Sequence, residues 1–132
     1  MHYTLIPTSC QLEALSGERV FHKCEDFQRV GAFKFRRAYH AIGQLRSLQP
    51  SRMFETVSSE KHGQGFALAC RLQGVTVHVV MAKPFSAMKH RAVLRYGTQM
   101  HEFENRSCTD ARLRELVDGY QPVVVQPYTI CS

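Results

Sequence analysis

The sequence predicts a single α+β domain, in which an antiparallel sheet of four to six strands carries one or two amphipathic helices on one face. Three observations support this fold class: a helical pattern over residues 33–48, two alternating runs over residues 66–82, and further short extended segments separated by turns. Strands joined by short turns usually pair with their neighbours, which favours a meander of hairpins. The length of 132 residues fits one domain spanning 1–132.

The strongest helical pattern runs over residues 33–48. Its apolar positions recur at intervals of three and four and form one stripe: Phe35, Ala38, Tyr39, Ile42 and Leu45. Pro50 disfavours the helical conformation at Gln49, so we expect the helix to end there.

Two alternating runs flank Gln73 and Gly74. Large apolar residues occupy every second position of residues 66–72 and again of residues 75–81. A two-residue turn ending in glycine between such runs is typical of a β-hairpin. One face of this hairpin carries small residues around Ala67, Ala69 and His78, which would let another element approach closely.

The remaining segments complete the predicted meander. We expect one helical turn at 10–15, strands at 53–59, 91–96 and 99–104, and turns at 62–65 and 97–98. A second helix is predicted over 107–120, followed by an extended edge segment at 122–128, where prolines interrupt pairing.

The charge is segregated along the chain. Lys and Arg total 17 and Asp and Glu total 11, which gives a formal net charge of +6. No acidic residue occurs in 27–54 or in 61–101, so we expect a positive face, which attracts phosphate backbones without reading sequence. The candidate nucleic-acid contacts are the densest cations: Lys34, Arg36, Arg37, His40, Lys89 and Arg91.

These observations predict a small non-catalytic binding or accessory protein that contacts nucleic acid or a nucleoprotein complex. Common nucleotide-binding, metalloprotease and serine-hydrolase motifs are absent from the sequence, and no catalytic residue is assigned. One alternative is a protein-interaction module, an inhibitor or assembly subunit, acting through the small-residue sheet face or the edge segment 123–125 and open to self-association. A second alternative is a metal-independent ribonuclease using His78, His90 and His101.

The cysteines and the apolar runs bear on metal binding and on the cellular compartment. The five cysteines are scattered without a Cys-x-x-Cys pair, so no metal site and no cofactor is expected, and reduced thiols favour the cytoplasm. The longest apolar run, residues 75–82, is too short to cross a membrane, and residues 1–4 do not resemble the start of a signal peptide.

Overall fold

The computed structural model describes residues 1–50, 53–58, 61–104, 115 and 122–125. Within these ranges the helices and strands follow in this order: α1 (Cys10–Ser16), two 3-10 turns η1 (Glu25–Phe27) and η2 (Arg29–Gly31), α2 (Lys34–Leu48), β1 (Phe54–Val57), α3 (Lys61–Gln73), β2 (Val77–Ala82), α4 (Ala87–Arg95), β3 (Gln99–Phe103) and β4 (Val123–Val124).

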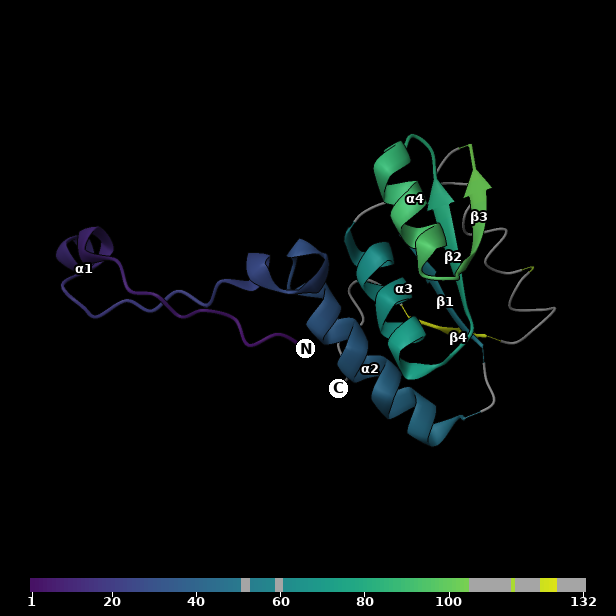
Figure 1. Cartoon of the computed structure of the whole chain (residues 1–132), viewed down its shortest axis with the longest axis horizontal. Coiled ribbons are helices and arrows are strands. Elements are labelled where there is room, and N and C mark those ends of the chain that lie inside the picture. Colours follow the sequence, from purple (N-terminus) through teal and green to yellow (C-terminus); the bar gives the residue numbers. More distant parts are fainter. Residues whose placement is uncertain (51–52, 59–60, 105–114, 116–121, 126–132) are drawn as a thin grey trace.

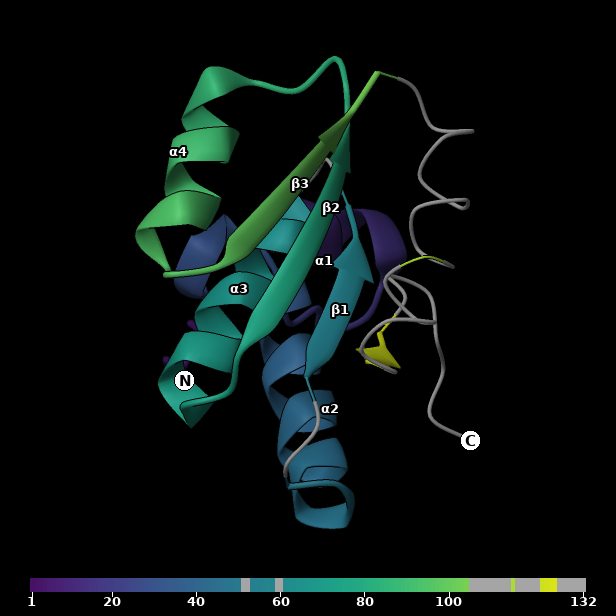
Figure 2. The same cartoon turned by 90° about the vertical axis from the view of Figure 1, so that its right-hand side faces the viewer.

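The four strands form one parallel sheet in the order β3-β2-β1-β4. Phe54 of β1 aligns with Val77 of β2 on one side and with Val123 of β4 on the other. Helices α3 and α4 connect β1 to β2 and β2 to β3, and they lie on the same face of the sheet (Figures 1 and 2). The predicted antiparallel meander is therefore wrong, and the fold is a parallel α/β arrangement.

The predicted hairpin over residues 66–82 is half wrong. Its second half is β2, but residues 66–72 lie inside α3. Phe66, Ala67, Ala69 and Cys70 are all fully buried, because α3 packs against the sheet and α2 at once. A helix surrounded in this way is apolar on several sides, which obscures the helical period and let the alternation imitate a strand.

Of the other predicted elements, some are confirmed and some are wrong. The helix at 33–48, the helical turn at 10–15 and the strands at 53–59 and 99–104 are confirmed as α2, α1, β1 and β3. The strand predicted at 91–96 lies mostly in α4, and the turn predicted at 62–65 is the first turn of α3. The edge segment contributes β4, whereas the helix predicted at 107–120 lies outside the described residues apart from position 115.

Residues 1–33, hereafter the arm, project away from the rest of the molecule, and α1 lies at the far end (Figure 1). Backbone hydrogen bonds join its two extended segments, from His22 N to Pro7 O at 2.9 Å and from Cys24 N to Leu5 O at 3.1 Å. The arm is tied to α2 by Glu25, which accepts hydrogen bonds from Nε and Nη2 of Arg36 at 3.2 and 3.0 Å.

The hydrophobic core lies between the sheet and α2, α3 and α4. Its fully buried members include Phe35 and Ile42 of α2, Phe66 of α3, and Phe54 and Val79 of the sheet. No described helix is long and apolar enough to span a bilayer.

Candidate functional site

The candidate site lies at the carboxyl ends of β1 and β4. From β1 the chain crosses to β2 on one side, whereas β4 pairs with β1 on the other side. In parallel α/β sheets such a reversal of strand order opens a crevice beyond the carboxyl ends, where ligands bind. Here the residues at that edge are Ser58, the first turn of α3, and Val125.

His62, in the first turn of α3, connects both strands at this edge. Its side chain is buried, and Nε2 lies 3.1 Å from Oγ1 of Thr56 on β1. Thr56 donates its only hydroxyl proton to the carbonyl of Val125 at 2.7 Å, so its oxygen accepts from the histidine ring. The edge is thus held by a chain of hydrogen bonds from α3 through β1 to the residue after β4.

The pKa of His62 is lowered to about 4, mainly by burial and also by the positive charges of Lys34 and Arg37, while a hydrogen bond with the Val125 backbone acts in the opposite direction. His62 is therefore a neutral imidazole at physiological pH. The backbone of Lys34 also lies near α3, because a Cβ at Gly65 would be 3.4 Å from the carbonyl carbon of Lys34.

Ser58 fixes the turn between β1 and α3. Its hydroxyl oxygen accepts a hydrogen bond from the backbone N–H of Gly63 at 3.1 Å, which satisfies a donor at the helix start. A side chain at Gly63 would place its Cβ 3.0 Å from the Ser58 carbonyl oxygen, so the turn leaves no room for one.

Lys34 reaches the same edge as the first residue of α2. Helix α2 approaches α3 so closely that a Cβ at Gly65 would lie 3.1 Å from the backbone nitrogen of Phe35. Phe35 is fully buried, whereas Lys34 is half-buried. The amine of Lys61 donates to the carbonyl of Gly31 at 3.2 Å and adds a second tie between the two helix starts.

The structure separates the six predicted nucleic-acid contacts. Four of them are on α2 (Lys34, Arg36, Arg37 and His40), and two are on α4 (Lys89 and Arg91). Helix α3 lies between these helices (Figures 1 and 2). Of the four on α2, the positive charges of Lys34 and Arg37 both lower the pKa of His62, whereas Arg36 binds Glu25 at the root of the arm and His40 is exposed.

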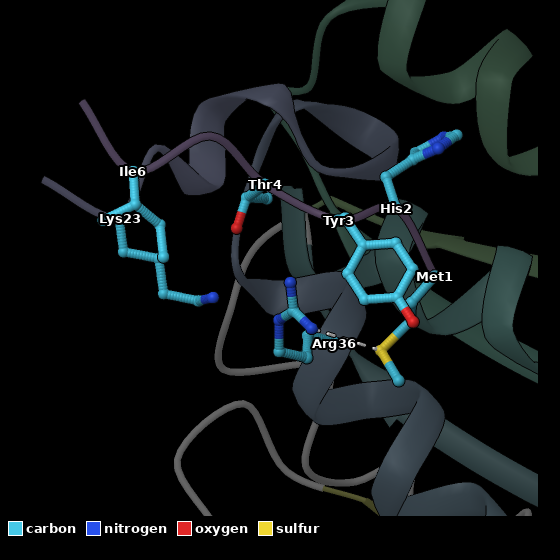
Figure 3. Close-up of a pocket in the computed structure, with 7 residues that line it drawn as sticks. All are labelled: Met1, His2, Tyr3, Thr4, Ile6, Lys23 and Arg36. Atoms are coloured by element: carbon cyan, nitrogen blue, oxygen red, sulfur yellow. Dashed lines mark hydrogen bonds between the residues drawn. The ribbon is translucent and has the colours of Figure 1, made fainter.

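Arg36 instead lines a hollow of about 410 Å³ between the arm and α2 (Figure 3). Its Nη1 points into this space toward the sulfur of Met1, 3.7 Å away. The remaining lining residues come from the arm: His2, Tyr3, Thr4, Ile6 and Lys23.

The three histidines considered for a ribonuclease do not form one cluster. His78 Nδ1 lies 2.9 Å from His101 Nε2, and the two rings stack. His90 pairs instead with Glu102 at 2.7 Å. Burial lowers the pKa of His78, and the neighbouring His101 lowers it further.

Comparison with known proteins identifies the family. Residues 3–131 match the family model described as pyridoxal-phosphate dependent enzyme. The chain belongs to this family. It is 38% identical over 129 residues to a serine racemase of Arabidopsis thaliana, and 40% identical over 94 residues to an L-threo-3-hydroxyaspartate ammonia-lyase of a Pseudomonas species. These matches cover 97% and 71% of this chain, but only 39% and 30% of the relatives.

Solved structures agree with this membership of the pyridoxal-phosphate family. The serine racemase of Dictyostelium discoideum superposes with a TM-score of 0.86 at 27% identity, over 96% of this chain and 41% of that one. Maize serine racemase gives 0.80 at 30% identity, over 97% and 40%. The chain thus spans about two fifths of the length of these relatives.

Family membership overturns the functional prediction. A non-catalytic protein that binds nucleic acid is wrong, and the two alternatives, an interaction module and a histidine-based ribonuclease, conflict with the same findings. The structure also removes the predicted small-residue sheet face, since Ala67 and Ala69 are buried in α3. The segment Val123–Val124 lies at the edge of the described sheet, as predicted, and pairs with β1 on its inner side.

The residues at the crevice fit the cofactor of the family. Pyridoxal phosphate needs a lysine amine to bond its aldehyde and donors for its phosphate. Two other lysines are engaged in ion pairs: Lys23 lies 3.8 Å from Glu25, and Lys83 lies 2.9 Å from Glu104. Lys34 is half-buried where α2 and α3 both begin, and helix starts favour anions.

Sequence reasoning missed Ser58 and His62 and gave Lys34 a different role. The missed signal was a serine just after a buried strand, followed by Gly63 and Gly65 at the start of a helix, because the start of a helix after a strand is a place where anions bind. It was hidden because residues 62–65 were interpreted as a hairpin turn.

Proposed function

We propose that this chain provides Lys34 as the cofactor-bearing lysine of a pyridoxal-phosphate dependent enzyme that acts on small α-amino acids with a β-hydroxyl group. The observation that carries the proposal is the position of Lys34 at the start of α2, where its backbone approaches Gly65 of α3, three residues after the buried His62. The substrate class follows from the relatives, which are named for serine and for L-threo-3-hydroxyaspartate.

Each residue at the crevice has a role in this proposal. When bound, the cofactor provides an electron sink for negative charge at the α-carbon of an amino acid. The Lys34 amine would hold the cofactor through its aldehyde, and the buried residues that follow it on α2 (Phe35, Ala38, Ala41 and Ile42) keep the backbone of Lys34 in place. The starts of α2 and α3 orient anionic groups, and uncharged His62 adds no second cation beside the Lys34 amine.

Mapping the attachment site tests the proposal. The purified protein is incubated with pyridoxal phosphate, reduced with borohydride, digested and analysed by mass spectrometry. We expect the label on Lys34, its loss in Lys34→Ala and its retention in Lys61→Ala, the neighbouring lysine. Labelling of another lysine, or equal labelling of Lys34→Ala, would overturn the assignment.

The substrate class has a separate test. Release of ammonia and formation of the opposite enantiomer are measured with L-serine, L-threo-3-hydroxyaspartate and L-alanine. We expect turnover of the two hydroxylated amino acids only, and turnover of L-alanine at the same rate would contradict the class while leaving the role of Lys34 intact.

The cytoplasm remains the proposed compartment. Among the described residues, Cys10, Cys24 and Cys70 are all free thiols, as expected in a reducing environment.

A further inference from the structure

Val30 has a backbone conformation that valine rarely adopts. Its φ of 59° and ψ of 15° are left-handed, and no other non-glycine residue in the described part of the chain has a positive φ. A β-branched residue is disfavoured there, because its Cβ crowds the following carbonyl oxygen. Gly31, at φ 62°, is left-handed as well, so the chain turns at two consecutive residues. This strained turn ends three residues before Lys34, where α2 begins.

Hydrogen bonds within the arm hold the strained turn closed. Gln28 is buried, and its Oε1 accepts hydrogen bonds from the backbone N–H of Arg29 at 3.1 Å and from that of His2 at 3.0 Å. The carbonyl of Gln28 accepts from the N–H of Gly31 at 2.9 Å, which closes the turn around Val30. None of these bonds uses the Val30 side chain.

The rest of the molecule holds the turn from its other side. The turn η2 packs against α3, where the Lys61 amine donates to the Gly31 carbonyl at 3.2 Å. The half-buried side chain of Val30 packs against the core cluster. A strained residue persists only where its surroundings over-determine its conformation, and such residues concentrate at functional sites.

Core packing alone does not require this strain. Val75, before β2, is also half-buried and packs against the same core without a positive φ. The left-handed turn instead determines how the chain enters α2. Just after Lys34, the Phe35 backbone nitrogen lies where a Cβ at Gly65 would be only 3.1 Å away. Because α3 fixes the helix start on one side, the turn before it is the other determinant of where the Lys34 backbone lies.

We propose that Val30 is a positioning residue for Lys34: its left-handed backbone sets the direction in which α2 begins, and thereby the place from which the Lys34 amine reaches the crevice. The inference rests on the proposed role of Lys34 as the cofactor-bearing lysine. Val30 acts through the backbone and not through contact with the cofactor. A misplacement of about 1 Å in a reacting group can cost on the order of 100-fold in rate.

Attachment of pyridoxal phosphate at Lys34 tests the proposal. The full 132-residue chain is incubated with increasing concentrations of pyridoxal phosphate and reduced with borohydride, and the label on the Lys34 peptide is measured by mass spectrometry. Val30→Gly lets the turn leave the left-handed region, because glycine populates both signs of φ. It should raise the half-saturating concentration about tenfold or more.

A rescue variant separates backbone from packing. Val30→Asn removes the apolar side chain, as glycine does, but asparagine tolerates the left-handed conformation. It should stay within about threefold of the unsubstituted protein. Val75→Gly is the matched control, because it removes a half-buried valine from the same core before the amino end of β2, at the end of the sheet opposite the crevice. It should stay within about twofold.

Gly31→Ala disturbs the same turn without removing a core side chain. The nearest atom to the added Cβ would be the Asp26 carbonyl oxygen at 3.8 Å, so space is available, but alanine is strained at φ 62°. The half-saturating concentration should rise about threefold or more. Circular dichroism and thermal unfolding check that every variant is folded at the temperature of labelling.

The outcomes separate this inference from the role of Lys34. Unchanged labelling of Lys34 in Val30→Gly and Gly31→Ala would overturn the positioning role and leave Lys34 as the attachment site. Losses in Val30→Asn or Val75→Gly as large as in Val30→Gly would also overturn it, because they would trace the effect to packing. Absence of label from Lys34 in the unsubstituted protein would overturn the proposed function, and the positioning role with it.

Discussion

Two basic segments that look alike in the sequence differ in their structural support. The first, residues 34–40, lies on α2, which buries Phe35, Ala38, Ala41 and Ile42. The second, residues 89–91, lies on α4, where Val93 is the only described residue that is buried. Lys34 therefore begins a helix with four buried residues, whereas on α4 Lys89 is half-buried and Arg91 is exposed on a helix with one. The contrast shows that packing around a lysine, rather than local charge, indicates a chemical role.

The largest expected difference between the segments is in cofactor chemistry. Lys34→Ala should reduce turnover by about 100-fold or more, because it removes a positioned amine, whereas Lys89→Ala should stay within about twofold. Steady-state kinetics at saturating pyridoxal phosphate measure both. A similar loss of turnover in Lys34→Ala and Lys89→Ala would contradict the assignment of a chemical role to Lys34 alone.

The pH dependence of stability tests the burial of His62. Its pKa is about 4 in the folded state, below the unperturbed value near 6.5, so the unfolded chain binds the proton first as pH falls. Stability is complete above pH 6.5 and declines toward pH 4 by up to about 3 kcal/mol, the equivalent of the pKa difference.

Urea unfolding at pH 7 and 4.5 measures this decline. His62→Gln should show a smaller decline than the unsubstituted protein, although His78, whose pKa is also lowered, leaves part of it. The exposed His40 is the matched control on the first basic segment, and His40→Gln should decline like the unsubstituted protein. An unchanged pH dependence in His62→Gln would contradict its buried, neutral state.

The joint between α2 and α3 can be tested with two glycines. Gly65→Ala should destabilise the protein by about 1–3 kcal/mol, because its Cβ would meet the backbone of Phe35 at 3.1–3.2 Å. Gly43→Ala, also inside a helix, faces the flexible side chain of Gln73 at 3.5 Å and should be neutral or stabilise by about 0.5–1 kcal/mol. Thermal unfolding compares them, and a Gly65→Ala variant as stable as Gly43→Ala would rule out the tight joint.

The smallest effect is expected on α4. Arg91 is exposed, so Arg91→Ala should change the free energy of unfolding by less than about 0.5 kcal/mol. Chemical denaturation measures it, and a loss above 1 kcal/mol would show that the second segment has structural support as well.

Sequence patterns correctly predicted the helices and strands whose apolar residues follow a single clear pattern. The stripe from Phe35 to Leu45 gave α2 almost to the residue, and the apolar run at Val77–Ala82 gave β2. They failed where a segment is buried on several sides, as in α3, or where strand direction depends on distant contacts. Parallel pairing of β1 with β2 requires α3 as a crossover, so misreading α3 as a strand made the whole sheet antiparallel.

The site was less predictable than the fold. Lys34 was singled out for its charge, but its proximity to His62 depends on the close approach of two helices at Gly65. The link from Thr56 to Val125 joins residues 69 positions apart, and no local pattern shows such a contact.

That same link has a consequence for the order of folding. β1 lies inside the sheet but acquires its neighbour β4 only after residues 58–122 have been synthesised. Contacts with such large sequence separation form slowly. A nascent chain can therefore complete the β1–α3–β2 unit before the link between Thr56 and Val125 closes, so the edge that carries the proposed site is assembled after the unit that supports it.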